Sequence, residues 1–563
     1  MELPIPILLK SFRQQDATSE LTEAAKALAD RRPVTTPDLK RAAGALSSGQ
    51  SDIAELLLTR FLKRQPNDPD ALHLMAQAAV AKFQFDFAES LLLRCLKYAP
   101  DFTLARYNYV KTLLKKGSGE EALRELEPLL NSEPDSFLFG DLRAVILSRL
   151  GRHTETAECY RHLTGIHPKI VFLWMRYAYA LKTVGRTGEC IVAYRKGIEL
   201  SPSLGEAFWG LSDLKTFRFS DADVSEMETQ LKRRDLSADN RTYFHFALGK
   251  AYHDTTDYQS AFQQFARANA LRRIGMEYSP ELTTERVSVY KKFFSTQLFA
   301  KRVGWGHDSS APIFVVGMHR AGSTLIEQIL CSHSSIDGIG EAQEVALIAT
   351  SLESEVAPQH RVPYPEVIGQ LDGDGLRQLG EKYLKAAREL HHGTLPFFVD
   401  KNPVNFWNTG LIHLILPNAK IVDVRRHPMA CCFSNFTSGF ESELRHTYKQ
   451  SDLGRYYVAY ADLMAHFDRV LPGRIHRVNY ERLVADTETE LGRLFEYLGI
   501  PFERRCLEFH QTARAILTPS SEQVRRPINQ EGINRWRHYE AWLGPLKAAL
   551  EPVLASYPEC AKG

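Results

Sequence analysis

The chain has 563 residues, of which 44% are hydrophobic and 25% charged, and it carries 70 Lys and Arg against 68 Asp and Glu. This length exceeds what one hydrophobic core usually holds, and the composition is that of a globular protein, so we expect several folded domains. The near balance of charge excludes any general argument for nucleic acid or an anionic membrane surface as the partner.

Neither a signal sequence nor a membrane-spanning segment is recognisable. The stretch from Met1 to Gln15 has no cationic leader and no sufficient apolar core. No uncharged apolar run reaches the roughly 18 residues of a spanning helix. The eight cysteines are spaced irregularly, with no C-x-x-C pair, which indicates neither a zinc site nor a disulfide framework. We therefore expect a cytoplasmic protein with no membrane span and no metal site.

A 34-residue period runs through the first half of the chain. A proline recurs once per period, and small or medium side chains stand 12 and 24 residues before it. Small side chains let two helices cross closely, and a proline ends the second helix because it lacks a backbone donor. This pattern is the tetratricopeptide signature, and it predicts an all-α solenoid over residues 37–280. The repeated positions are Pro66, Pro100, Pro134, Pro168 and Pro202, then Ala54, Ala88, Ala122, Thr156 and Cys190, then Ala42, Ala76, Val110, Ala144 and Ala178, with Gly117, Gly151 and Gly185 in the same phase.

The edges of this array are less regular. Residues 1–36 lie outside the period and are interpreted as a leader helix or a flexible start. The period breaks over residues 203–245, where we expect a longer or irregular helix pair. A last repeat is recognised at Gly249, Tyr252, Ala261, Phe265 and Ala268.

A stacked solenoid has an extended concave face that typically holds a peptide or another protein. We therefore expect the repeats to recruit or orient a partner. A spacer or an oligomerisation arm is the alternative interpretation, and the sequence singles out no partner-binding residue.

The second half, over residues 305–560, alternates short apolar runs with helical stretches. This alternation predicts an α/β domain with a parallel sheet covered by helices on both faces. Ligands of such sheets bind beyond the carboxyl ends of the strands, so the residues that follow each strand form the candidate site. The expected strands are 313–316, 397–399, 419–424 and 475–478.

The first of these strands leads into a phosphate-type loop. Gly317 and Gly322 bound the loop, and Ser323 and Thr324 open a helix, in the spacing G-x-x-x-x-G-S-T. Backbone N–H groups and a helix N-terminus that point to one spot form an anion site. Ser323 stands where the usual lysine of a nucleoside triphosphatase would be, and Arg320 is the cation of the loop. The loop is therefore expected to hold a phosphate without splitting a triphosphate.

Two later strands are also followed by cationic side chains. Arg425 and Arg426 come directly after the strand 419–424, and Ser434 follows on the next helix, which Pro428 would begin. A guanidinium and a hydroxyl so placed could hold a second phosphate. Lys401 follows the strand 397–399 and would lie at the same rim.

With these motifs in place, residues 310–555 resemble the sulfotransferases that use 3′-phosphoadenosine 5′-phosphosulfate (PAPS), and most closely the tyrosylprotein sulfotransferases and their repeat-bearing bacterial relatives. The family loop P-R-S-G-T-T-L reads H-R-A-G-S-T-L here, from His319 to Leu325. The resemblance implies that this loop binds the 5′-phosphate and that Arg426 and Ser434 bind the 3′-phosphate. The loop lacks the family's proline and first serine.

The same resemblance extends to the reacting groups and the closing segment. It places the catalytic base on Glu341, which is 21 residues beyond Arg320, and a lysine near the sulfuryl group on Lys401. Further implied contacts to the nucleotide fall on Tyr480, Ser520, Ser521 and Arg535, where Arg535 replaces a family lysine and keeps its charge but not its geometry.

The implied reaction is in-line transfer of a sulfuryl group from PAPS to an acceptor hydroxyl, with adenosine 3′,5′-bisphosphate (PAP) as product. Arg320, Lys401, Ser520 and loop N–H groups would stabilise the charge that develops, and Glu341 would take the proton of the acceptor. Pro403 stands where the small-molecule enzymes of the family have a catalytic histidine. The mechanism requires no metal.

Two other interpretations remain open at this point. A phosphate-loop kinase would use Asp423 as its metal-holding acid, but it lacks the loop lysine. An interaction scaffold with a degenerate transferase domain would leave the function to the solenoid. For the transferase, the acceptor could be a protein or a glycan.

Overall fold

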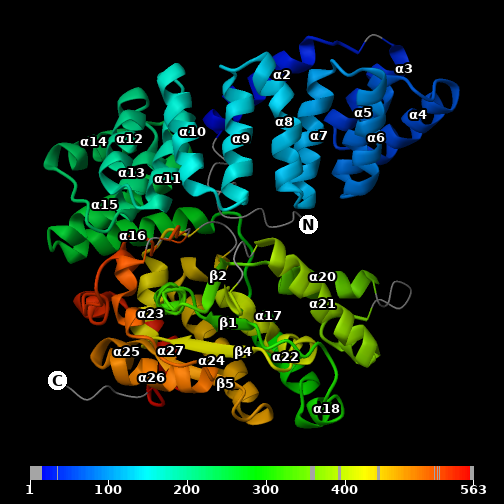
Figure 1. Ribbon diagram of the computed structural model, residues 1–563. Coiled ribbons are helices and arrows are strands. Elements are labelled where there is room, and N and C mark those ends of the chain that lie inside the picture. The colour runs from blue at the N-terminus through cyan, green and yellow to red at the C-terminus, as the bar shows by residue number, and fades with distance from the viewer. Residues whose placement is uncertain are drawn as a thin grey trace. The chain divides into compact units, whose positions relative to one another are not determined.

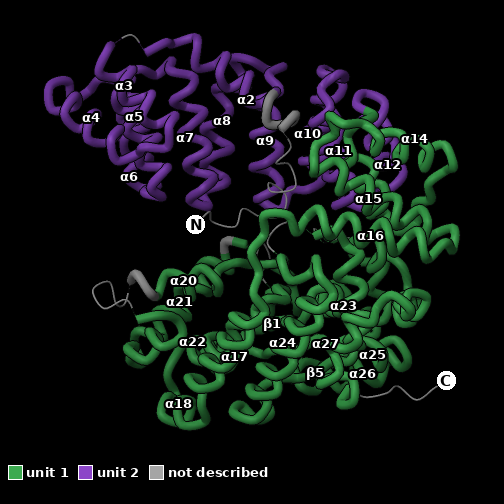
Figure 2. Tube along the Cα trace, turned by 180° about the vertical axis from the view of Figure 1, so that it is seen from behind, with its two compact units in different colours: residues 1–4, 202–563 green, residues 5–201 purple. Residues whose placement is uncertain are grey.

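The computed structural model describes residues 15–34, 36–355, 362–390, 395–440, 444–512, 514–516, 518 and 520–557. The chain divides into two compact units, one formed by residues 5–201 and the other by residues 202–563 with the first four residues (Figure 2). Each unit has an architecture of its own.

The unit of residues 5–201 is built from pairs of helices. The second helix of each pair ends two residues before a repeat proline, as predicted, so Pro66 follows α4 and Pro202 follows α12. Within the region expected to be a leader, a helix α2 lies against α7, α9 and α11. The helices are α2 (Gln15–Asp30), α3 (Pro37–Ser47), α4 (Ser51–Arg64), α5 (Pro69–Ala81), α6 (Phe85–Tyr98), α7 (Thr103–Lys116), α8 (Gly119–Ser132), α9 (Phe137–Arg149), α10 (His153–Ile166), α11 (Val171–Val184) and α12 (Thr187–Leu200).

The small repeat positions lie where the helices cross. All ten are buried, with Ala54, Ala88 and Ala122 fully inaccessible and Thr156 exposed by 4%. Gly117 and Gly185 end their helices with φ of 88° and 81°, a left-handed conformation that favours glycine. The sequence period therefore reports helix packing as well as helix ends.

Four further helices begin the second unit. They are α13 (Gly205–Asp213), α14 (Asp221–Leu231), α15 (Ala238–Asp254) and α16 (Tyr258–Arg273). The irregular region that was expected at 203–245 consists of the pair α13 and α15 with α14 inserted between them, and Ser220 and Asp223 form a capping box at the start of α14.

The compact units and the repeat pattern divide the chain at different places. The pattern continues to residue 280, whereas α13 to α16 belong to the same unit as the sheet. Aromatic contacts join α16 to the C-terminal part of this unit: Tyr258 stacks on His538 at 4.5 Å, and Phe262 stacks on Trp542 at 5.7 Å. The last repeat helices are thus part of the body that carries the sheet.

The sheet has five parallel strands in the order β2-β3-β1-β4-β5. The strands are β1 (Pro312–Gly317), β2 (Ile336–Gly340), β3 (Phe397–Lys401), β4 (Lys420–Arg425) and β5 (Ile475–Asn479), and Figure 1 shows helices around them. Four of them match the expected strands. The fifth, β2, was missed because its sequence, IDGIG, has one buried side chain and two glycines and therefore no apolar run.

The helices of this domain bury the sheet, and Ile313 to Val316 of β1 are completely inaccessible. None of the described helices is both long and apolar enough to cross a membrane. The helices are α17 (Pro280–Phe293), α18 (Thr296–Ala300), α19 (Ser323–Leu330), α20 (Glu344–Glu355), α21 (Gly373–Leu390), α22 (Thr409–Ile415), α23 (Pro428–Phe436), α24 (Gln450–Val470), α25 (Tyr480–Ala485), α26 (Thr487–Leu498) and α27 (Gly544–Leu554), with the 3₁₀ turns η1 (Glu366–Gln370), η2 (Pro403–Asn408), η3 (Arg445–Tyr448), η4 (Arg504–Gln511), η5 (Gln523–Arg525) and η6 (Arg535–Trp542).

Candidate active site

The loop between β1 and α19 has the backbone of an anion site. Gly317 adopts φ of 145°, and a Cβ there would lie 2.5 Å from the carbonyl oxygen of Val424, so only glycine fits. Gly322 adopts φ of 106° at the N-cap of α19. Arg320 has φ of 63°, a left-handed conformation that is unusual for a residue with a side chain. The loop is held in this shape by the sheet beneath it.

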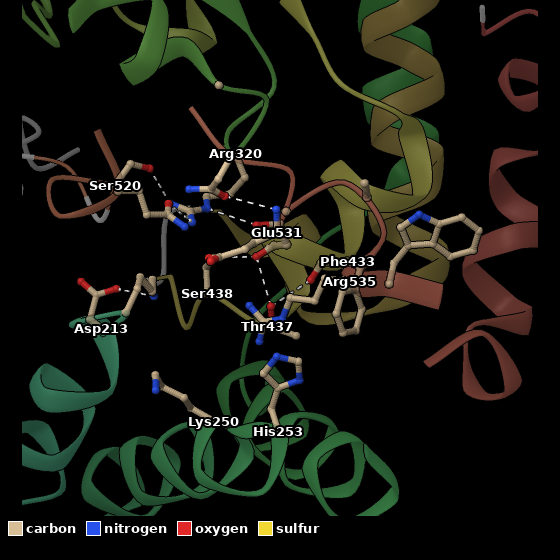
Figure 3. Close-up of a pocket in the computed structure, with 18 of the residues that line it drawn as sticks. Asp213, Lys250, His253, Arg320, Phe433, Thr437, Ser438, Ser520, Glu531 and Arg535 are labelled. Carbon is tan, nitrogen blue, oxygen red and sulfur yellow. Dashed lines mark hydrogen bonds and ion pairs between the residues drawn. The ribbon is translucent and has the colours of Figure 1, made fainter. Parts of the chain in front are cut away.

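A cavity of about 750 Å³ opens at this loop (Figure 3). Among the described residues, its lining includes seven Lys and Arg side chains against three Asp and Glu, an excess of four positive charges. This is the chemistry of a polyanion site. The sequence-predicted residues that line it are Arg320, Gly322, Ser323, Thr324, Arg426, Ser434, Tyr480, Ser520 and Arg535.

Three guanidinium groups meet in the cavity. Arg320 donates to the hydroxyls of Ser434 at 3.2 Å and Ser520 at 2.7 Å. Arg426 donates to the backbone carbonyl of Arg320 at 3.0 Å, and its guanidinium lies 5.1 Å from the ring centre of Tyr480. The Nε atoms of Arg426 and Arg535 are buried and make no hydrogen bond with any described residue.

Burial, and then the neighbouring cations, weaken the hold of Arg320 and Arg535 on their protons. Burial lowers the pKa of Arg320; Asp213 opposes this in part, whereas Arg426 and Arg535 lower the pKa further. Burial likewise lowers the pKa of Arg535, and Arg426 adds to the effect. Like charges held together out of water are stabilised by an anion that binds between them.

Glu341 and Lys401 lie outside the lining of this cavity. Glu341 directly follows β2, and Lys401 ends the neighbouring strand β3. The Lys401 ammonium donates to the Glu341 carboxylate, and the Lys401 side chain is 1% exposed against 25% for Glu341. The predicted base and the predicted sulfuryl-binding lysine are therefore paired with each other. Ser521 is also outside the lining and is 1% exposed.

One wall of the cavity was not found by sequence reasoning. It comes from α13 and α15, and Figure 3 shows Lys250 and His253 across the cavity from Arg320. Lys250 donates to the Phe217 carbonyl at 2.7 Å, and burial lowers its pKa to about 8. Burial and Arg535 lower the pKa of His253 to about 3. The break in the repeat period was the one signal in the sequence that this region differs.

Two further polar residues of this domain, His333 and the kinase candidate Asp423, have structural contacts. His333 hydrogen-bonds with the carbonyl oxygen of Pro501 at 2.8 Å and accepts from the backbone N–H of Ser335 at 3.0 Å. Asp423 is completely buried, accepts hydrogen bonds from Tyr460 and Arg425, and is not among the residues that line the cavity. Its position gives no support to a metal-holding role in a kinase.

Comparisons with known proteins agree with this architecture. A model of the sulfotransferase family matches residues 312–504, and tetratricopeptide repeat models match residues 79–146 and 173–204. The chain therefore carries tetratricopeptide repeats followed by a domain of the sulfotransferase family.

Two curated relatives are informative. A protein of Aquifex aeolicus (strain VF5), described as uncharacterized, is 28% identical over 445 residues, which cover 77% of this chain and 57% of the relative. Protein-tyrosine sulfotransferase A of Caenorhabditis elegans is 23% identical over 255 residues, which cover 43% of this chain and 65% of the relative. The chain thus spans 57% and 65% of the lengths of these relatives.

Solved structures give weaker likenesses. The sulfotransferase domain from the curacin biosynthetic pathway is 18% identical with a TM-score of 0.32, and it covers 44% of this chain and 98% of its own. MamA (residue 41 to its end) of Desulfovibrio magneticus RS-1 is 18% identical with a TM-score of 0.28, and it covers 30% of this chain and 98% of its own. Neither likeness bears on function.

Proposed function

We propose that the protein transfers a sulfuryl group from PAPS to a hydroxyl of an acceptor. The observation that carries this proposal is the meeting of Arg320, Arg426 and Arg535 in one cavity. Among the described residues, Arg320 and Arg426 donate to hydroxyl, amide and carbonyl oxygens rather than to carboxylates. A doubly phosphorylated nucleotide would supply the anionic partners that these donors lack.

In the proposed reaction the acceptor oxygen attacks sulfur in line with the departing phosphate. The bond from sulfur to the acceptor oxygen forms, and the bond from sulfur to the 5′-phosphate oxygen of PAPS breaks. The proton of the acceptor hydroxyl passes to the Glu341 carboxylate, and PAP departs. Arg320, Ser520 and the loop N–H groups stabilise the charge that gathers on the departing phosphate, and Lys401 stabilises the sulfuryl oxygens.

The roles proposed for the cavity residues agree with their positions in the lining. Arg426 and Ser434 would hold the 3′-phosphate, with Arg535 beside them, and Ser323 and Thr324 open the helix that faces the 5′-phosphate. Tyr480 and Ser521 complete the proposed nucleotide contacts. The Glu341 side chain is a quarter exposed and can contact an acceptor hydroxyl. The Lys401 side chain is buried, so it can contact only a group that enters the space next to its ammonium.

The acceptor is proposed to be a protein or a glycan that the repeats recruit. Tetratricopeptide repeats typically bind proteins, and one relative is a protein-tyrosine sulfotransferase by name, which favours a protein hydroxyl. A cytoplasmic location, which rests on the irregular cysteine spacing, belongs to the same proposal.

Nucleotide selectivity tests the proposal directly. Calorimetric titration of the full chain should show tighter binding of PAP than of ATP. Arg426→Met should weaken PAP binding by about tenfold to a hundredfold, because it removes a charge-assisted phosphate contact, and should change ADP binding far less. Arg377→Met, an exposed arginine on α21, is the matched control and should change neither. Equal or tighter binding of ATP would overturn the proposal.

Transfer itself requires a second measurement. The full chain is incubated with PAPS labelled in its sulfuryl group and a dialysed cell extract, and a labelled macromolecule is expected. Binding of PAP without any transfer of label would favour the degenerate scaffold instead.

A further inference from the structure

A buried carboxylate that the proposed reaction does not use lies between two cations. Glu327 stands on α19, one turn beyond the phosphate loop, and is 3% exposed. Its Oε1 accepts from Arg514 Nη2 at 2.6 Å, and its Oε2 lies 3.7 Å from Lys401 Nζ. Lys401 is therefore shared between two carboxylates, Glu327 and Glu341.

The charges of this network depend on one another. Burial alone would raise the pKa of Glu327, but Arg514 and Lys401 overcome it and hold the pKa below its ordinary value. Burial lowers the pKa of Arg514, but the nearby Glu327 carboxylate more than compensates and raises this pKa above its ordinary value. Gly338 of β2 makes room for Arg514, because a Cβ there would lie 2.5 Å from its Nη2. A buried ion in such a group is strongly destabilised when its partner is removed.

The same helix also fastens the segment that reaches the nucleotide cavity. Gln328, next to Glu327, donates to the carbonyl oxygens of Phe509 at 3.0 Å and Thr512 at 3.2 Å. Arg514 stands two residues beyond Thr512, and Ser520 and Arg535, later in the chain, are in the cavity lining. Through Glu327, α19 contacts both this segment and Lys401.

The two carboxylates around Lys401 differ in what they can do. Glu341 is a quarter exposed and can meet an acceptor hydroxyl, whereas Glu327 is closed off from solvent. Once Glu341 takes a proton it is neutral and no longer offsets the charge of the buried ammonium. The carboxylate of Glu327 remains ionised beside Lys401 at that moment.

We propose that Glu327 is a positioning residue, which holds the Lys401 ammonium in place while Glu341 accepts the proton. This inference rests on the proposed function, in which Lys401 contacts the sulfuryl group. A purely structural role, in which Glu327 only anchors Arg514, makes a different prediction. Arg514→Met breaks the anchor and leaves Glu327 beside Lys401, whereas Glu327→Gln removes both interactions.

The test compares these two variants in the full chain. The rate of label transfer from PAPS to a fixed amount of dialysed extract is measured against PAPS concentration, and PAP affinity is measured by calorimetry. Both variants should weaken PAP binding by a similar factor. Glu327→Gln alone should also lower the rate at saturating PAPS, by about tenfold or more relative to Arg514→Met. Equal saturating rates for the two variants would overturn the proposal.

Controls separate this role from loss of folding. Asp423→Asn, which neutralises another buried carboxylate paired with an arginine, should lower the melting temperature without changing the saturating rate. If Glu327→Gln does not fold, Glu327→Asp keeps the charge but draws it away from Lys401. It should then reduce the saturating rate below that of Arg514→Met, and a rate equal to that of Arg514→Met would count against the proposal. Absence of transfer by the unsubstituted chain would instead overturn the proposed function.

Discussion

At the residue scale, the notable feature is the direct pairing of Glu341 with Lys401. The Lys401 ammonium, 1% exposed, donates to the Glu341 carboxylate, so the two charges offset each other. In the proposed reaction, Glu341 accepts a proton and Lys401 binds the sulfuryl group. The two side chains can do so only after the substrates have replaced the contact between them. The order of strands β2 and β3 in the sheet brings the two side chains together, although 60 residues separate them in the chain.

Glu341→Gln tests the role of the base. We expect the label-transfer rate to fall by about a hundredfold to ten-thousandfold, the usual contribution of a general base, while PAP affinity changes little. PAP binding should survive because Glu341 is outside the cavity lining and Glu327 still pairs with Lys401. The exposed Glu366→Gln serves as the control. Parallel loss of PAP binding and transfer would mean that Glu341 is structural.

At the element scale, the crossing of α15 and α16 connects helix packing with the cavity. A Cβ on Gly249 of α15 would lie 2.5 Å from the ring of Phe265 on α16. Phe265 is 2% exposed and also lines the cavity, so the two helices can approach only because residue 249 has no side chain. The same crossing places Lys250 and His253 in the cavity wall.

Gly249→Ala should therefore act on stability and on binding together. Although alanine favours a helix, the overpacked contact with Phe265 should lower the free energy of unfolding by about 1–3 kcal/mol, measured by urea denaturation. PAP affinity should fall because the wall is displaced. Gly188→Ala, a helical glycine with open space around it, should leave stability unchanged or raise it. Equal effects of the two substitutions would contradict this account of the crossing.

At the scale of the whole molecule, the helices α13 to α16 belong to the repeat array by sequence and to the sheet-bearing unit by packing. They also supply one wall of the cavity of this unit. Buried contacts bind them there, including the Asn269 side chain, which donates to the Phe436 carbonyl at 2.9 Å. The smallest part of the chain that forms the site should thus include them.

Truncation tests this expectation. A fragment of residues 202–563 should fold and bind PAP with nearly the affinity of the full chain. A fragment of residues 305–563 should bind PAP at least tenfold more weakly, because it lacks the wall and exposes aromatic side chains such as Trp542. Calorimetry and thermal unfolding would check both. Undiminished binding by the shorter fragment would show that the wall is dispensable.

Buried histidines should make the protein sensitive to acid. Burial lowers the pKa of His73 to about 4 and of His446 to about 3, and both side chains are at most 5% exposed. Below pH 6.5 the unfolded chain binds protons at these two histidines while the folded chain does not. The free energy of unfolding therefore decreases as the pH is lowered. Each of the two histidines should lower the free energy of unfolding by about 2 kcal/mol when the pH is changed from 7.5 to 5. Urea denaturation at the two pH values would check this, and equal stability at both would contradict it.

The sequence by itself determined the repeat array and most of the sheet, because both are written in local periodicity. Prolines and small residues recur wherever helices end and cross, and apolar runs form β1, β3, β4 and β5. The motifs after these strands also pointed to cavity residues such as Arg320, Arg426 and Ser434, since parallel strands end at one edge.

Tertiary structure alone decided the rest. The strand β2 has no apolar run and exists because β3 offers it a partner. The wall from α13 and α15, the pairing of Glu341 with Lys401 and the place of Glu327 depend on contacts between residues far apart in the chain. Local periodicity records which face of an element is buried, whereas the partner of a buried charge is set by packing between elements, and no sequence pattern carries that information.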